Sequence, residues 1–188
     1  MTKIYKLKEE EKKELLQIAR STLEEYATKN EIPPVNTHNG TLEKNAAAFV
    51  TMKTQDGRLR GCIGTFSADT PLYQTVQNMT LAAAFQDPRF PPVREHETQD
   101  LLIEISVLSP RQEISAEEVE VGVHGLFVTR GHLSGVLLPQ VPVELRWSRS
   151  TFLQEVCRKA GLPPDAYTLP DTKLEAFTAD VFSEEQEG

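Results

Sequence analysis

Residues 58–66 carry the side chains of this chain that are best suited to chemistry. Cys62 stands between Gly61 and Gly64, and Arg60 lies two residues before it. Flanking glycines leave room for a ligand to approach the sulfur, and a nearby guanidinium stabilises a thiolate. Cys62 is therefore a candidate nucleophile, and the other three are candidate ligand-binding residues. The alternative is a structural cysteine, because free cysteines are usually buried and inert.

Two residues further along the chain could join this site. Arg89 lies in a loop with three prolines, so its backbone is stiff and its guanidinium is a candidate anion clamp. An ion pair with Asp87 or Glu95 is the competing interpretation. His124 precedes a glycine at the start of an expected strand, and it would supply the base for Cys62 if the two residues meet. The alternative role for such a histidine is a structural hydrogen bond.

Other chemistry is not indicated by the sequence. The remaining histidines have no metal-ligand spacing to one another or to carboxylates, and no nucleotide-binding, zinc-protease or nucleophile-elbow motif is present. We therefore expect no metal site and no cofactor. Cys157 stands among apolar residues at helical spacing, which is typical of a core position. The two cysteines do not suggest a disulfide scaffold.

Composition limits the partners of the protein. The 188 residues carry a formal net charge of −8, which argues against nucleic acid because phosphate binding needs clustered lysines and arginines. No apolar run is long enough to span a membrane, and no apolar leader segment opens the chain. We expect a cytoplasmic protein that does not bind membranes.

A hairpin positions the cysteine. Asp56-Gly57 predicts a two-residue type I′ turn, which places Thr51 opposite Cys62 and Lys53 opposite Arg60. One face of this hairpin is then apolar and packs on the core. The apolar face would hold Leu59, Ile63, Val50 and Met52. The other face would hold Lys53, Arg60, Thr51, Cys62, Phe49 and Phe66, with a gap at Gly64.

The remaining elements follow from hydrophobic periodicity and from turn residues. Helices are predicted over 8–29, 71–86 and 152–160, the last capped by Ser150 or Thr151. Strands are predicted over 101–108, 125–129, 135–138 and 174–182, with a helical turn over 115–118. Because strands and helices alternate irregularly around a hairpin, the sequence favours an α+β fold, mainly antiparallel sheet flanked by helices.

The chain resembles the AMMECR-domain family, also called AmmeMemoRadiSam system protein A, over about residues 12–182. The central matches are Leu59-Arg60-Gly61-Cys62-Ile63-Gly64 and Asp87-Pro88-Arg89-Phe90-Pro91-Pro92. Further matches are Ser106-Val107-Leu108, His124-Gly125, residues 135–141 and Lys159-Ala160-Gly161-Leu162. Two departures from the family pattern, Pro142 and the segment 148–150, lie outside the central motifs.

The resemblance implies one AMMECR-type domain over 1–188, with a larger and a smaller subdomain and the cysteine motif near a cleft between them. We expect the larger lobe to comprise 1–94 plus 150–188 and the smaller lobe 95–149. The resemblance also implies Memo-like and radical-SAM partners in a modification pathway, while leaving the reaction unassigned. Two functions follow: binding of a small anionic or nucleobase-like ligand, or a protein-interaction module in which the cysteine motif is structural.

Overall fold

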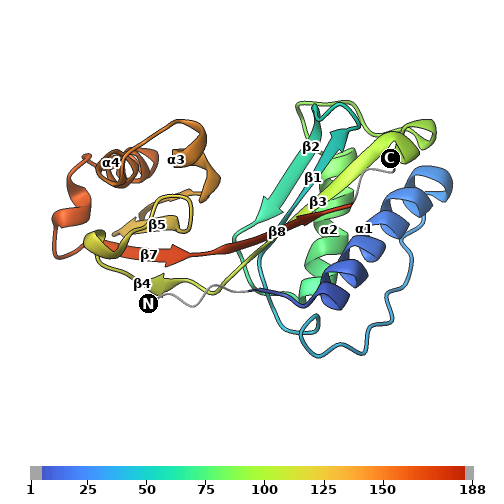
Figure 1. Ribbon diagram of the computed structural model, residues 1–188, viewed down its shortest axis with the longest axis horizontal. Coiled ribbons are helices and arrows are strands. Elements are labelled where there is room, and N and C mark those ends of the chain that lie inside the picture. Colours follow the sequence, from blue (N-terminus) through green and yellow to red (C-terminus); the bar gives the residue numbers. More distant parts are fainter. Residues whose placement is uncertain (1–5, 185–188) are drawn as a thin grey trace. The chain divides into compact units, whose positions relative to one another are not determined.

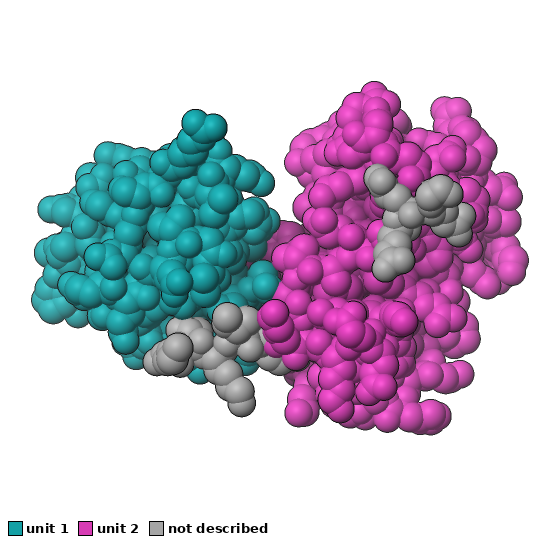
Figure 2. Space-filling view, in the orientation of Figure 1, with its two compact units in different colours: residues 1–5, 109–179 teal, residues 6–108, 180–188 magenta. Residues whose placement is uncertain are grey.

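A computed structural model of the chain describes residues 6–184 and contains two four-stranded antiparallel sheets flanked by helices (Figure 1). The chain divides into two compact units (Figure 2). We call residues 6–108 with 180–184 the large unit, and residues 109–179 the small unit. The predicted α+β class is confirmed. Within residues 6–184, none of the helices has the length and hydropathy needed to cross a bilayer.

The large unit is built on a sheet with the strand order β2-β1-β3-β8. Helix α2 packs on β1 and β2, and helix α1 packs on α2 and on β3. The elements of this unit are α1 (Glu9–Lys29), β1 (Ala48–Thr54), β2 (Leu59–Thr65), α2 (Leu72–Phe85), the 3-10 helix η1 (Glu95–Asp100), β3 (Leu101–Leu108) and β8 (Ala179–Ser183).

Helix α1 forms where the sequence predicted it, because an apolar stripe at helical spacing runs along one side. Leu15, Ala19 and Leu23 on this stripe are fully buried. Each buried leucine stabilises the fold by about 1.5–3 kcal/mol relative to an exposed one. Glutamates fill the first turn, where the helix dipole favours negative charge, and Asn30 ends the helix in a left-handed conformation.

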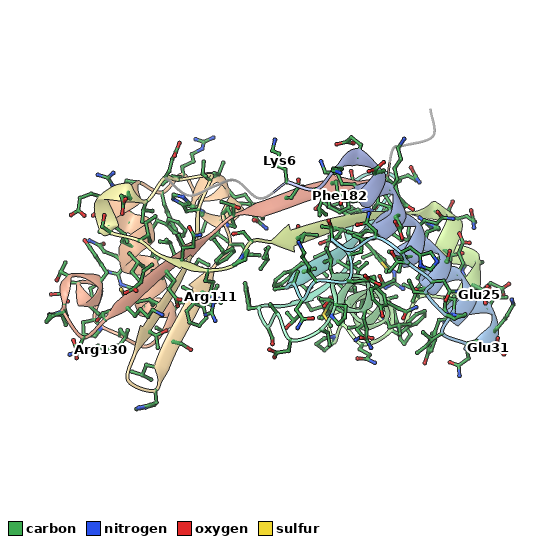
Figure 3. The ribbon with its side chains drawn as sticks, turned by 90° about the horizontal axis from the view of Figure 1, so that it is seen from below. Lys6, Glu25, Glu31, Arg111, Arg130 and Phe182 are labelled. Atoms are coloured by element: carbon green, nitrogen blue, oxygen red, sulfur yellow. The ribbon has the colours of Figure 1, made fainter. Side chains whose placement is uncertain are left out.

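The helix-facing side of the central strands is apolar. Val50, Met52 and Ile103 are completely buried there, each alternating with a partly exposed neighbour. At the far edge of the sheet, Phe182 on β8 lies beside α1, with the Lys12 ammonium 5.9 Å from its ring centroid (Figure 3). The two sides of the sheet are therefore clearly distinguished by their side chains.

The tip of the β1–β2 hairpin differs from the prediction. The Gly57 amide donates to the Thr54 carbonyl at 2.8 Å, and the Thr54 amide donates to the Arg58 carbonyl at 2.9 Å. Gly57 has a φ of +84°, whereas Asp56 does not adopt a positive φ. The prediction of a two-residue type I′ turn is therefore wrong. The loop is the longer form, in which a type I turn is followed by a left-handed residue.

A β-bulge compensates for this longer loop. Thr51 lies opposite Cys62 as predicted. The register shifts between Met52 and Lys53, so that Lys53 lies opposite Leu59 instead of Arg60. The extra residue on β2 restores the predicted pairing toward the middle of the strands. Leu59, predicted to be in the core, is consequently on the other face and 41% exposed.

The small unit has its own sheet, in the order β4-β7-β5-β6, and its own core. Helix α4 packs on β5 and β6 through Phe152 and Val156, which are fully buried. Its elements are β4 (Gln112–Glu113), η2 (Ala116–Glu118), β5 (Gly125–Arg130), β6 (Leu133–Leu137), α3 (Gln140–Glu144), α4 (Arg149–Lys159), η3 (Ala166–Thr168) and β7 (Lys173–Phe177).

Several expectations for this part of the chain need correction. A single strand was predicted over 174–182, but the structure has two strands there, β7 and β8. They are separated at Thr178 and belong to different sheets. Ser148, rather than Ser150 or Thr151, caps α4 by accepting the Thr151 amide. Helix α3 was not predicted.

The division into units also differs from the expected lobes 1–94 plus 150–188 and 95–149. Residues 95–108 belong to the large unit because β3 pairs with β1 throughout its length. Residues 150–179 belong to the small unit because α4 packs on its sheet and β7 pairs with β5. The spatial neighbours of a strand, which the sequence does not display, decide this division.

Candidate functional site

The side of the large unit's sheet that faces away from α1 and α2 surrounds Cys62, and we call it the open face. Its side chains alternate along the strands with the buried core residues and are partly exposed. It comprises Phe49, Thr51, Lys53, Leu59, Cys62, Gly64, Leu102, Glu104, Ser106 and Val181. Of the predicted site residues, Cys62 and Gly64 lie on this face.

A buried carboxylate fixes the backbone of Cys62. The Cys62 amide donates to Asp87 Oδ2 at 2.9 Å, and the Cys62 carbonyl accepts from Arg89 Nη2 at 3.1 Å. Arg89 also donates from Nε to Asp87 Oδ1 at 3.0 Å and from Nη2 to Asp87 Oδ2 at 2.7 Å. Because β2 is an edge strand, these outward-pointing backbone groups have no strand neighbour. The Asp87–Arg89 pair takes the place of one.

The ion pair shifts the pKa values of both Asp87 and Arg89. The Arg89 guanidinium holds the pKa of Asp87 well below its usual range, helped by the Cys62 and Arg89 amides and opposed by burial. The same carboxylate raises the pKa of Arg89. The Arg89 side chain is 54% exposed, but its charge is balanced by Asp87. Of the two interpretations of Arg89, the structure contains the ion pair with Asp87.

The sulfur of Cys62 is held from the neighbouring strand. The Thr51 hydroxyl donates to Cys62 Sγ at 3.1 Å, as the predicted pairing of these residues allows. Thr51 in turn lies opposite Glu104 on β3, whose Oε2 accepts from Lys53 Nζ at 3.0 Å. A row of thiol, hydroxyl and carboxylate therefore crosses three strands. Lys53, predicted to lie on the same face as Cys62, is neutralised by Glu104.

Arg60 is directed to a different partner. Its Nε and Nη2 donate to the two carboxylate oxygens of Glu97 at 3.0 and 3.2 Å, which ties β2 to η1. The side chain is 12% exposed, and among the described residues its buried Nη1 has no hydrogen-bond partner. Because of the bulge, Leu59 occupies the position on the open face that was predicted for Arg60.

The two glycines of the motif allow close packing. A Cβ on Gly61 would lie 2.2 Å from the Ala83 carbonyl oxygen, so a side chain would collide with the backbone of α2. A Cβ on Gly64 would lie 2.1 Å from the Phe49 ring, which occupies the gap predicted at this position. Both glycines are thus accounted for by contacts within the large unit.

His124 belongs to the small unit, whereas the other predicted site residues belong to the large unit. It is buried, and its Nδ1 accepts the Glu120 amide at 3.0 Å. Burial lowers the pKa of His124, although the nearby Glu120 and Glu118 oppose that effect. This bond is the structural alternative weighed for such a histidine.

Three acidic residues around the site were not predicted as parts of it: Asp87, Glu97 and Glu104. Asp87 carried a signal, since its ion pair with Arg89 was the competing interpretation of that loop. Glu104 could have been recognised only after β3 was known to neighbour β1, because this adjacency brings it to Lys53. For Glu97 the sequence offers no comparable signal.

The fold and site define a class: an α+β protein with two antiparallel sheets, in which a partly exposed cysteine on an edge strand is clamped by a downstream Asp-Pro-Arg loop. The AMMECR1 family model matches residues 16–182. The chain belongs to the AMMECR1 family.

Relatives from archaea extend over almost the whole chain. A protein from Thermococcus gammatolerans is 41% identical over 194 aligned positions, covering 97% of this chain and 94% of the relative. Protein PH0010 from Pyrococcus horikoshii is 40% identical over 193 positions, with 97% and 94% coverage. The crystal structure of PH0010, titled as an uncharacterized protein, matches with a TM-score of 0.83 over 96% of this chain and 95% of that one.

Proposed function

We propose that the protein binds a small, neutral, nucleobase-like group on the open face, in contact with Cys62. The observation that carries this proposal is the clamp on Cys62. Its amide, carbonyl and sulfur are all held, by Asp87, Arg89 and Thr51, while its side chain remains partly exposed. A preorganised group at an accessible surface is the arrangement that a binding site requires.

The charge balance around Cys62 favours a neutral ligand over an anionic one. Arg89 is paired with Asp87, and Lys53 is paired with Glu104. An anion would have to compete with these carboxylates for the two cations, and its gain from a partly exposed cation is small. A neutral group with donors and acceptors could instead bond to the Thr51 hydroxyl and to the polar edges of the Lys53–Glu104 pair.

Aromatic residues beside Cys62 support a planar ligand. The rings of Phe49 and Phe66 meet edge to face, with centroids 5.0 Å apart and planes at 64°. Phe49 lies over Gly64, two residues from Cys62, and both rings are partly exposed. Stacking of a base on such a ring contributes about 1–3 kcal/mol in other proteins.

Protection of Cys62 from alkylation tests this function. The probes are adenosine, which is neutral, and AMP, which carries the same base with a phosphate. We expect adenosine to slow iodoacetamide labelling of Cys62, and Phe49→Leu to remove the protection. A matched control, Phe182→Leu, changes an aromatic ring on the opposite side of the same sheet and should keep it. Protection by neither probe would refute nucleobase binding, and protection by AMP alone would refute a neutral ligand.

A second candidate function is supported by a separate observation. Leu59 and Val181 are exposed apolar side chains on the open face, at 41% and 51%. Such side chains favour contact with another protein. In this alternative the clamp on Cys62 is structural and the open face is an adaptor surface. The resemblance to the AmmeMemoRadiSam system supports Memo-like and radical-SAM proteins as partners.

Co-purification with those two proteins tests the alternative. We expect the Leu59→Asp and Val181→Asp variants to lose association while they keep the circular dichroism spectrum of the parent. Val143→Asp, at an exposed apolar residue of the small unit, is the control that should still bind. Unchanged association in both open-face variants would exclude this surface as the adaptor interface.

A further inference from the structure

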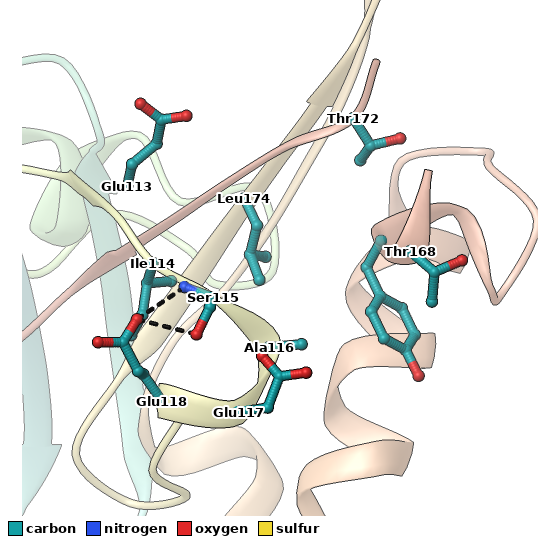
Figure 4. A pocket seen from close by; sticks show the side chains of 10 residues that line it. Glu113, Ile114, Ser115, Ala116, Glu117, Glu118, Thr168, Thr172 and Leu174 are labelled. Carbon is teal, nitrogen blue, oxygen red and sulfur yellow. Dashed lines mark hydrogen bonds between the residues drawn. The ribbon is translucent and has the colours of Figure 1, made fainter. Parts of the chain in front are cut away.

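A pocket of about 620 Å³ lies wholly within the small unit and is unrelated to the residues around Cys62 (Figure 4). One wall is η2 with the residues that precede it, and the other is the segment from η3 to the beginning of β7. Figure 4 shows Glu117 on the η2 side and Thr168 on the η3 side. The volume falls within the range of small-molecule sites, about 300–1,000 Å³.

The lining of this pocket combines an apolar part with an acidic rim. Leu174 is buried, and Ile114 and Tyr167 are partly buried, so they form an apolar surface. Glu113 and Glu117 are exposed at the rim. The lining residues include no lysine and no arginine. The pocket is therefore both negatively charged and able to bury methylene groups.

Several polar groups of the pocket lack partners. Within residues 6–184, the carboxylates of Glu113 and Glu117 form no ion pair and no hydrogen bond, unlike Glu118, which accepts from the Ser115 amide and hydroxyl. Thr172 Oγ1 is buried and also has no partner among the described residues. A buried hydroxyl without a partner is costly and points to a missing donor or acceptor.

We infer that this pocket binds an alkylammonium or guanidinium group carried on an apolar chain. The methylenes would lie on Leu174, Ile114 and the Tyr167 ring, as the stems of lysine and arginine do on apolar surfaces. The cation would pair with a carboxylate of the acidic rim, Glu113 or Glu117, which Figure 4 shows at opposite ends of the pocket. The same chemistry is available from a free amine or from a basic side chain of a partner protein.

Titration with hexylamine tests the inference, read from amide chemical shifts in ¹⁵N-labelled protein. We expect shifts confined to residues 113–118 and 167–174, with a Kd at or below about 1 mM. For a probe this small, that affinity is well within the limit per atom. Removing the carboxylate that pairs with the cation, by Glu113→Gln or Glu117→Gln, should weaken binding about twofold to fivefold, the range of exposed ion pairs. Glu144→Gln is the matched control, an exposed glutamate of the same unit outside the pocket, and should have no effect.

Two further probes make the outcomes decisive. Hexanol has the same chain without the charge, so equal binding of hexanol would overturn the cationic ligand. N-acetyl-lysine N-methylamide presents a lysine side chain, so binding as tight as that of hexylamine would assign the site to a partner's side chain. Tighter binding of hexylamine would assign it to free amines. Shifts scattered over other acidic surfaces, or unchanged by both pocket variants, would overturn the inference, and neither result depends on the open face.

Discussion

Cys62 and Cys157 differ in exposure, which governs whether a reagent can reach a thiol. Cys62 is partly exposed on the open face, whereas Cys157 is completely buried in the core of the small unit. Burial also raises the pKa of Cys157, which disfavours its thiolate.

We expect iodoacetamide to alkylate Cys62 in the folded protein and Cys157 only through unfolding. At a stability of about 5 kcal/mol or more, fewer than about one molecule in a thousand is open. Mass-spectrometric site assignment as a function of time gives both rates. Equal, slow labelling of the two cysteines, released together by denaturant, would show that Cys62 is protected despite its exposure.

Asp87 should make stability depend on pH in the acidic range. The pKa of Asp87 is lowered by folding, so the unfolded chain takes up its proton first, near the ordinary value of about 3.9. Its contribution to stability is therefore complete above that pH and declines as the pH falls below it. Urea unfolding at pH 6 and at pH 3 measures the decline.

The Asp87→Asn variant isolates this contribution from that of other carboxylates. We expect it to lose about 2 kcal/mol at pH 6, the value of charged hydrogen bonds to one group. At pH 3 the difference from the parent should shrink. A difference that is the same at both pH values would show that Asp87 acts through shape and not through its charge.

At the scale of elements, the packing of β2 against α2 depends on Gly61. A methyl group there would lie 2.2 Å from the Ala83 carbonyl, so strand and helix must separate. We expect Gly61→Ala to destabilise the protein by about 2 kcal/mol, within the range for overpacked cores. Gly40→Ala is the control, because no atom lies within 4 Å of its added Cβ. Similar thermal midpoints for the two variants would contradict this account.

The hairpin shows how far local sequence can determine structure. Alternation predicted the pairing of Thr51 with Cys62 correctly, because it depends on which side chains must be buried. The turn at Asp56-Gly57 was assigned one residue too short, and a bulge between Leu59 and Gly61 compensates for it. The two deviations cancel at Cys62 and do not cancel at Leu59 and Arg60.

The sequence did not predict which distant segments of the chain lie next to one another. The residues over 174–182 predict a single strand, although the chain changes sheets at Thr178. Alternation reports burial on one side of a strand and carries no information on which strand lies next to it. For the same reason the carboxylates that neutralise Lys53 and Arg60 were not foreseen.

At the scale of the whole molecule, the small unit is one continuous segment inserted into the large unit. The two ends of this segment lie side by side. The Ser109 amide donates to the Thr178 carbonyl and the Thr178 amide donates to Ser109 Oγ, both at 2.8 Å. The core of the small unit comprises only residues of that segment.

We therefore expect a fragment of residues 109–179 to fold without the rest of the chain. Dispersed amide signals and a cooperative thermal transition would establish folding, with marginal stability because domains of this size bury a limited core. Within the full chain, hydrogen exchange should then resolve separate protection for the two units. A fragment that stays unfolded would show that the insertion relies on its host for stability.

The edge position of β2 gives the Asp87–Arg89 pair a consequence for how separate molecules meet. Unpaired amides and carbonyls along an edge strand are a template for the strand of another molecule, and this pairing is the first step of many aggregates. The pair occupies the amide and carbonyl of Cys62 in the middle of that edge. A chain that lost this pair would expose a longer continuous edge. It should therefore aggregate more as the protein concentration rises, even where its native fold survives.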